Sequence, residues 1–96
     1  MLTGKQRSYL KSLAMDLDTA VYIGKAELTE NVLAEIDNYL TAHELVKVKI
    51  QEGSELEAKD AANKVAEKLG AEYVQAIGRR FVLYRESENR QIVLPR

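Results

Sequence analysis

The sequence predicts an α/β (α+β) domain in which three helices pack on one mixed four-stranded sheet. Three segments repeat apolar residues at helical spacing, four shorter segments are apolar or alternate at strand spacing, and capping or turn residues separate them. The resulting order is helix, strand, helix, strand, helix, strand, strand. The chain has 96 residues, 46% of them hydrophobic, which is enough for one core. We therefore expect a single domain over residues 1–96, with residues 86–96 as a C-terminal tail.

The first helix is expected to begin after Thr3. Thr3 and Gln6 fit a capping box, in which each side chain binds a backbone N–H group left over at the helix start. The apolar stripe that follows is Leu10, Leu13, Ala14 and Leu17. The helix should end near Asp16–Asp18, and Ala20–Ile23 should form a short buried strand.

Thr29 is the expected cap of the second helix. Leu28 and Leu33 stand on either side of its start and can form a hydrophobic staple. The buried stripe of this helix is Val32, Leu33, Ile36 and Leu40. His43 falls at the helix end, where a capping or surface role is expected rather than catalysis.

The segment Leu45–Ile50 alternates as a half-buried strand does. Val46, Val48 and Ile50 should face the core, which leaves Lys47 and Lys49 on the other face.

A third helix is predicted by a second capping box at Ser54–Glu57, and Gly70 should end it. Its inner face is Ala58, Ala62, Val65 and Leu69. Two strands, Tyr73–Ile77 and Phe81–Arg85, then form a hairpin through Gly78-Arg79, where we expect the arginines of the turn to be solvated. Ile92–Leu94 should pack back on the domain.

The stretch from Val21 to Glu30 combines a strand end, a glycine-lysine turn and a helix start. Glycine lets a backbone approach a ligand closely, and a helix start offers unpaired N–H groups. The stretch is thus a candidate phosphate-binding element. A tight connection without a ligand explains the same residues, and the sequence leaves both readings open.

Composition and motifs exclude several functions. The chain has no cysteine and one histidine, so neither a disulfide framework nor a structural zinc site is expected. Neither common glycine-rich nucleotide-binding motif is present, and no serine-histidine-acid set can be assembled. We expect no enzyme, no cofactor and no small-molecule substrate. The N-terminal residues lack the apolar run of a signal peptide and no stretch could span a bilayer, so no membrane association and a cytoplasmic location are expected.

Charge is segregated although the net charge is only −1. Residues 26–46 contain five acids and no lysine or arginine, whereas residues 77–96 contain five arginines and two glutamates. This distribution permits one basic face. Five tyrosines could stack on bases, but each could equally lie in the core or at its rim. We expect Tyr22 and Tyr84, inside strands, to be partly buried.

Several short motifs occur in the order found in one known family. They are Gln6, Leu10 and Leu13-Ala14; Ile23-Gly24-Lys25; Leu28-Thr29-Glu30; Leu45-Val46-Lys47-Val48-Lys49; Ile77-Gly78-Arg79-Arg80-Phe81-Val82-Leu83-Tyr84-Arg85; and Ile92-Val93-Leu94-Pro95-Arg96. Over nearly the whole chain this set resembles the CRM domain, the chloroplast RNA splicing and ribosome maturation module, in its stand-alone bacterial YhbY-type form. The resemblance implies a fold similar to the C-terminal domain of translation initiation factor three. It also implies RNA binding and association with precursors of the large ribosomal subunit.

The family carries a G-x-x-G loop similar to that of the KH domain, and this chain departs from it. The loop reads Gly24-Lys25-Ala26-Glu27, so glutamate replaces the second glycine. Glu27 removes a flexible position and puts a negative charge beside the helix start. We therefore expect Lys25 to keep more of its role than the loop geometry.

The function predicted is a non-enzymatic, monomeric RNA-binding protein that acts on ribosomal RNA during large-subunit assembly. The candidate RNA-binding residues are Lys5, Lys11, Gly24, Lys25, Lys47, Lys49, Arg79, Arg80 and Arg85. Lys47 and Lys49 take part only if their face of the sheet is open. The alternative is a protein-interaction module recruited to the ribosome through its acidic second helix. A double-stranded DNA binder is less favoured, because no helix has a basic face to read bases, and a small-molecule enzyme is the last choice.

Overall fold

The computed structural model describes residues 2–88 and 90–96, and this part of the chain contains the expected three helices and four strands. In chain order they are α1 (Gly4–Ala14), β1 (Val21–Ile23), α2 (Glu30–His43), β2 (Leu45–Ile50), α3 (Ala58–Leu69), β3 (Glu72–Ile77) and β4 (Arg80–Tyr84). The predicted fold class and element order are confirmed.

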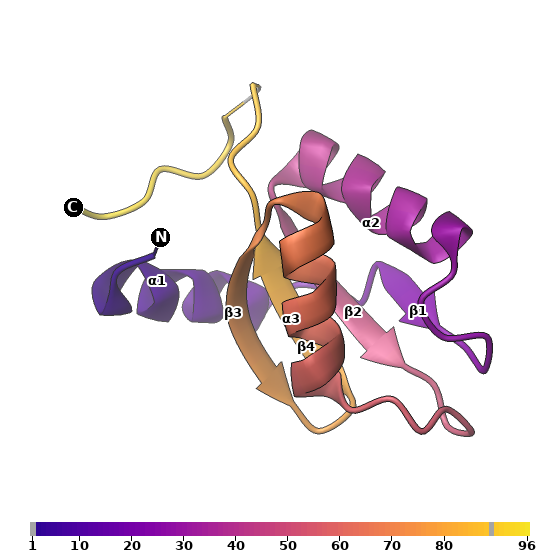
Figure 1. The fold of residues 1–96 in the computed structure, drawn as a ribbon. Coiled ribbons are helices and arrows are strands. Elements are labelled where there is room, and N and C mark those ends of the chain that lie inside the picture. The colour runs from indigo at the N-terminus through magenta and orange to yellow at the C-terminus, as the bar shows by residue number, and fades with distance from the viewer. Residues whose placement is uncertain (1, 89) are drawn as a thin grey trace.

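The four strands form one mixed sheet in the order β1-β2-β4-β3. β1 runs parallel to β2, and β4 runs antiparallel to both of its neighbours. β1 is a three-residue edge strand, while the long hairpin partners β3 and β4 complete the other side (Figure 1). This strand order decides which side chains of distant segments become neighbours.

Helices cover both faces of the sheet, but unequally. α2 and α3 pack on one face over a core cluster that includes Val48 of β2 and Phe81 of β4. α1 lies on the other face, passing behind β3 in Figure 1. There Leu10 and Ala14 pack with Val82, as part of a second, smaller cluster. Among residues 2–88 and 90–96, no helix has both the length and the apolar character needed to cross a membrane.

Most local signals in the sequence act as predicted. The capping box of α1 is present in both directions between Thr3 and Gln6. The Thr29 hydroxyl accepts the N–H of Val32 at 3.1 Å, and Gly70 ends α3 in the left-handed conformation at φ 64°. These signals succeed because each is formed by residues within one helical turn.

The predicted capping box at Ser54–Glu57 is wrong. α3 begins at Ala58, and its N-cap residue Glu57 makes no side-chain capping bond. Ser54 is instead held in the preceding loop, where its hydroxyl accepts the N–H of Leu56 at 3.2 Å and donates to Glu27 at 3.3 Å. A loop contact with a residue from another segment therefore overrides the local pattern. The first helix also ends earlier than expected, at Ala14.

Glu44 is a buried acid that no motif in the sequence marks. It ends α2 with φ 68°, and its fully buried carboxylate accepts the backbone N–H groups of Ser87, Gln91 and Ile92. Burial by itself raises the pKa of this carboxyl, but these three bonds and the charge of Arg90 outweigh it, so that the pKa lies below its ordinary value. Glu44 thereby fastens the C-terminal tail to the end of α2.

The tail lies against α1, as expected for its apolar residues. Ile92 and Leu94 pack on the second cluster. The Gln6 amide donates to the carbonyl of Pro95 at 3.1 Å, which joins the first helix to the end of the described chain. The tail and α1 together cover one end of their face of the sheet.

Candidate nucleic-acid interface

A continuous row of side chains crosses all four strands at the end of the sheet that α1 does not cover. Tyr22 of β1 lies opposite Lys49 of β2, Lys49 lies opposite Arg80 of β4, and Arg80 lies opposite Ile77 of β3. Their strand neighbours Val21, Ile50, Phe81 and Ala76 pack into the core on the α2–α3 side. Because side chains alternate along a strand, these four residues share the opposite face. We call Tyr22, Lys49, Arg80 and Ile77 the open row.

The open row is accessible because the second cluster occupies only the other half of this face. That cluster is built on Leu45, Val74, Val82 and Tyr84, which lie toward the opposite end of the strands. Tyr22 is 51% exposed and Ile77 is 68% exposed, whereas Tyr84 is only 5% exposed. The expectation of partial burial is therefore wrong for Tyr84, which is buried, and Tyr22 is exposed more than expected.

A hollow of about 500 Å³ opens beside the open row. Its lining residues are Tyr22, Lys49, Gln51, Glu52, Arg79 and Arg80. The lining thus has three cations and one acid, and this excess of positive charge suits an anionic ligand. A second, smaller hollow of about 220 Å³ adjoins it on the α1 side, where Met15, Lys47 and Ile77 face Arg80.

Arg79 and Arg80 have different roles although they are neighbours in the turn. The Arg79 guanidinium donates to the carbonyls of Ile50 at 3.1 Å, Gln51 at 2.7 Å and Ser54 at 3.1 Å. Arg79 is exposed, as expected for a turn side chain, but its guanidinium also ties the hairpin to the loop after β2. Arg80 is exposed and points to the open row.

Lys47 and Lys49 meet the condition stated for them, since their face of the sheet is open at this end. Lys49 lies in the open row. Lys47 lies one alternation further along β2, and its amine donates to the carbonyl of Leu17 at 2.9 Å. That bond anchors Lys47 beneath the segment after α1, so Lys49 is better placed to meet a ligand.

The loop Gly24–Glu27 follows β1 directly and borders the hollow through Gln51. A Cβ on Gly24 would lie 3.5 Å from the Gln51 side-chain oxygen, which is an ordinary contact. The loop closes as a turn, with the Glu27 N–H donating to the Gly24 carbonyl at 3.0 Å, and Glu27 takes φ 61°. Glycine is favoured at that angle, so Glu27 takes a backbone conformation that glycine adopts more easily.

Lys25 is exposed and its stem lies over the loop after β2. A Cβ on Gly53 would come within 2.9 Å of the Lys25 Cε atom, so the glycine makes room for the lysine. Gly53 itself has φ 97°. Lys25 thus lies where the loop after β1 meets the loop after β2.

The two lysines of α1 are separated by the length of the helix. Lys11 is exposed and lies one turn before Met15, which borders the open face. Lys5 lies at the far end of α1, where its amine donates to the Arg96 carbonyl at 3.2 Å. Lys11 is therefore nearer than Lys5 to the end of α1 that borders the open row.

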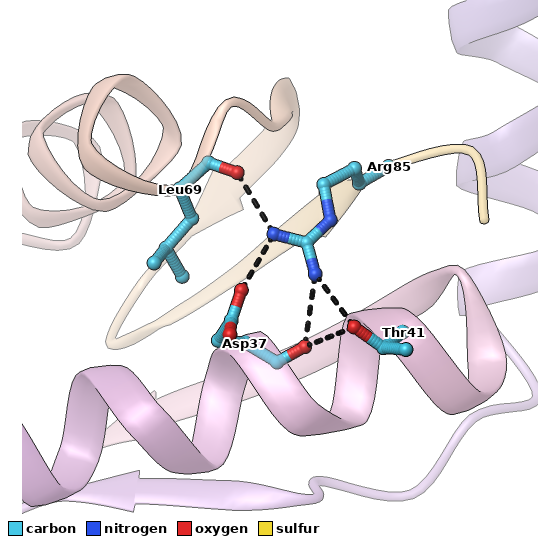
Figure 2. Close-up of polar contacts among 4 residues, drawn as sticks. All are labelled: Asp37, Thr41, Leu69 and Arg85. Atoms are coloured by element: carbon cyan, nitrogen blue, oxygen red, sulfur yellow. Dashed lines mark hydrogen bonds and ion pairs between the residues drawn. The ribbon is translucent and has the colours of Figure 1, made fainter.

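Arg85 lies on the opposite face of the sheet, among α2 and α3. Figure 2 shows its guanidinium between the Asp37 carboxylate at 2.7 Å, the Leu69 carbonyl at 2.8 Å and the Thr41 hydroxyl at 3.0 Å. It also donates to the Asp37 carbonyl at 3.0 Å. Arg85 is a structural clamp between the two helices and is not brought together with the other candidate residues.

Tyr22 and Ile77 belong to the open row, but no motif in the sequence marked them as site residues. The sequence does contain a signal for the position of Tyr22, because its neighbours Val21 and Ile23 are apolar and face the core. Alternation then places the ring on the other face. Knowing that this face is uncovered requires the strand order, which depends on pairing between distant segments.

Comparison with known proteins identifies a matching family. Residues 2–85 match the model of the CRS1 / YhbY (CRM) domain. The chain is 47% identical over 96 residues to a Haemophilus influenzae protein named "RNA-binding protein", covering 99% of this chain and 96% of that one. It is 40% identical over 96 residues to "Probable RNA-binding protein YqeI" of Bacillus subtilis, covering 99% of this chain and all of the relative.

A solved structure has the same fold. The solution structure of the hypothetical protein SAV1595 from Staphylococcus aureus superposes with a TM-score of 0.83 at 44% sequence identity. The match covers 99% of this chain and 100% of that chain. The architecture described above is therefore shared over nearly all of this chain and the whole of that one.

Proposed function

The chain belongs to the CRS1/YhbY (CRM) domain family, and from that premise we propose that it binds structured RNA through the open face of its sheet. We further propose that the RNA is ribosomal RNA in precursors of the large ribosomal subunit, on which the protein acts as an assembly factor without enzymatic activity. The names of its relatives support RNA as the ligand. The ribosomal role extends the family resemblance noted in the sequence.

One observation carries the proposal. Lys49 and Arg80 are direct cross-strand neighbours on an uncovered face, and a hollow with a net excess of cations opens beside them. Two like charges directly opposite each other destabilise a sheet, so this pairing has a cost that an anionic ligand would remove. Phosphate oxygens are such a ligand, because the guanidinium offers a fork of donors and the ammonium a point charge.

The remaining cations extend this surface along the edge of the hollow. Lys25 stands on the loop after β1, and Lys11 stands on the α1 side. α2, the acidic helix, packs on the other face of the sheet. Bound RNA would then meet the basic face while the acidic face repels it, which orients the protein. Readout through backbone and shape is the usual mode for double-stranded RNA.

A matched pair of double variants tests the face. Lys49→Ala with Arg80→Ala removes two positive charges from the open row, and Lys64→Ala with Lys68→Ala removes two from exposed positions on α3. Affinity for a structured ribosomal RNA fragment is measured across a salt series. The open-row variant should bind more weakly and show a log–log salt slope shallower by about two, while the α3 variant should resemble wild type. Equal slopes for both variants would show that the phosphates are met elsewhere.

The ribosomal role is tested in cells. Tagged wild-type protein should co-sediment with precursors of the large subunit, and the open-row variant should be lost from that fraction while the α3 variant stays. If the purified domain binds no RNA yet still co-sediments, recruitment by a protein partner through the acidic helix is the better reading.

A further inference from the structure

Tyr22 is an exposed aromatic side chain that does not pack in either core cluster. It is 51% exposed on a three-residue edge strand, and its ring shares a face with Lys49 and Arg80. The core side of β1 is already filled by Val21 and Ile23. Tyr22 therefore contributes an aromatic surface to the hollow rather than to the core.

The flat faces of a nucleobase can stack on such a ring, but in a double helix they are covered by the neighbouring pairs. Only an unpaired base in a loop, bulge or single strand exposes them. Stacking on aromatic side chains next to a positive groove is how proteins hold such bases with little sequence preference. Tyr22 offers the aromatic ring, and the hollow beside it offers the positively charged groove.

We propose that the open row holds an unpaired nucleotide of RNA, with its base stacked on Tyr22 and its flanking phosphates at Lys49 and Arg80. This inference rests on the proposed function and names the ligand class: RNA with at least one unpaired nucleotide beside a helix. The amide of Gln51 and the carboxylate of Glu52 line the same hollow and offer polar partners for the base edge.

The spacing of the row fits this arrangement. Directly opposed residues on neighbouring strands have Cβ atoms about 5 Å apart, so Tyr22 and Lys49 can contact one base and its own phosphate. Arg80 lies one strand further on, about 10 Å from Tyr22, within reach of the next phosphate. Two cations separate Tyr22 from Ile77, the other exposed apolar side chain of the row, which disfavours an apolar protein partner across this face.

The test uses two blunt-ended RNA duplexes, each annealed from two strands so that neither has a hairpin loop. One carries a single bulged 2-aminopurine, and in the other every nucleotide is paired and a 5′-phosphate makes the number of phosphates equal. Binding is measured for wild type, Tyr22→Phe, Tyr22→Leu and Tyr22→Ala. Tyr9→Ala serves as the control, since Tyr9 is an exposed tyrosine on α1 outside the row. Circular dichroism checks that each variant is folded, and Tyr22→Leu keeps apolar bulk on the strand if the alanine variant is not.

The wild type and Tyr22→Phe should prefer the bulged RNA and change the 2-aminopurine fluorescence as its base stacks. Tyr22→Ala and Tyr22→Leu should lose on the order of tenfold in affinity for the bulged RNA. The affinity of these two variants for the fully paired RNA should change little, and Tyr9→Ala should bind both RNAs as wild type does. The loss should persist as salt rises, because stacking is not screened.

Two results overturn the inference in different ways. Suppose that the wild type binds both RNAs, and that the Tyr22 variants lose affinity for both RNAs equally or for neither. Tyr22 is then not the stacking site, while the proposal of RNA binding stands. If the wild type binds neither RNA above the background of an unrelated protein of similar charge, the proposed function and the inference fall together.

Discussion

Two glutamates of this chain adopt the left-handed backbone conformation, and they give a controlled measure of what one buried carboxylate contributes. Glu44 has φ 68° and a fully buried side chain that accepts three backbone N–H groups. Glu27 has φ 61°, and its carboxylate accepts one hydrogen bond, from the Ser54 hydroxyl at 3.3 Å. Alanine at either position keeps the Cβ and the backbone cost. The difference between the two variants therefore isolates the carboxylate contacts.

We expect Glu44→Ala to lower the free energy of unfolding by about 3 kcal/mol, since each of three hydrogen bonds contributes about 1 kcal/mol and the donors left behind are partly buried. Glu27→Ala should lower it by about 0.5 kcal/mol, because its single bond is long and partly solvated. Urea denaturation measures both values. Hydrogen exchange should also accelerate at the amides of Ser87 and Ile92 in Glu44→Ala alone.

Two results would refute a stabilising role for the Glu44 hydrogen bonds. If the two variants lose stability to within about 0.5 kcal/mol of each other, the three bonds to Glu44 contribute nothing net and the tail is held by other contacts. Unchanged exchange at Ser87 and Ile92 would lead to the same conclusion without relying on the denaturant extrapolation.

Four further predictions concern single residues. The pKa of Glu44 lies below its ordinary 4.5 in the folded protein, so its stabilisation is complete above that value and lost as the pH falls through the folded pKa; unfolding measured from pH 7 to pH 3 should show this loss in wild type and not in Glu44→Gln. Arg79→Ala should lower stability by about 2 kcal/mol because it removes three hydrogen bonds to carbonyls, whereas exposed Arg80→Ala should change stability by less than about 0.5 kcal/mol and weaken RNA binding more; thermal melts and anisotropy titrations separate the two. Gly24→Ala should leave folding intact, because the added Cβ meets only an ordinary contact at 3.5 Å, yet it should weaken RNA binding if phosphate approaches that backbone; Glu27→Gly, in turn, should tighten binding by about 1 kcal/mol at low salt and less at high salt.

Those parts of the fold that depend on neighbouring residues could be predicted from the sequence. The Thr3 capping box, the Thr29 cap and the Gly70 terminus each need only one turn of chain. The alternation of Leu45–Ile50 also placed Lys49 on the correct face. Ser54 is the exception that shows the limit, since its partner Glu27 comes from a loop 27 residues away.

The candidate site was predictable only in part, because contacts between segments far apart in the sequence decide which side chains are free to bind. Charge and resemblance selected Lys49 and Arg80 together with Arg85, but an arginine looks the same in sequence whether it meets solvent or a carboxylate. Arg85 finds Asp37 and Arg79 finds three carbonyls only after distant elements assemble. Tyr22 became a candidate when the strand order left its face uncovered.

The placement of α1 has a consequence for how the chain acquires its structure during synthesis. α1 is made first, yet it packs on Val82 and Tyr84 and on the tail residues Ile92 and Leu94. The backbone N–H of Leu2 is bonded to the carboxylate of Glu72, a separation of 70 residues. Contacts so distant along the chain form late and slow folding. We therefore expect the segment from α3 through β4, whose three elements make local contacts with one another, to organise early. The N-terminal helix should dock only after nearly the whole chain has left the ribosome.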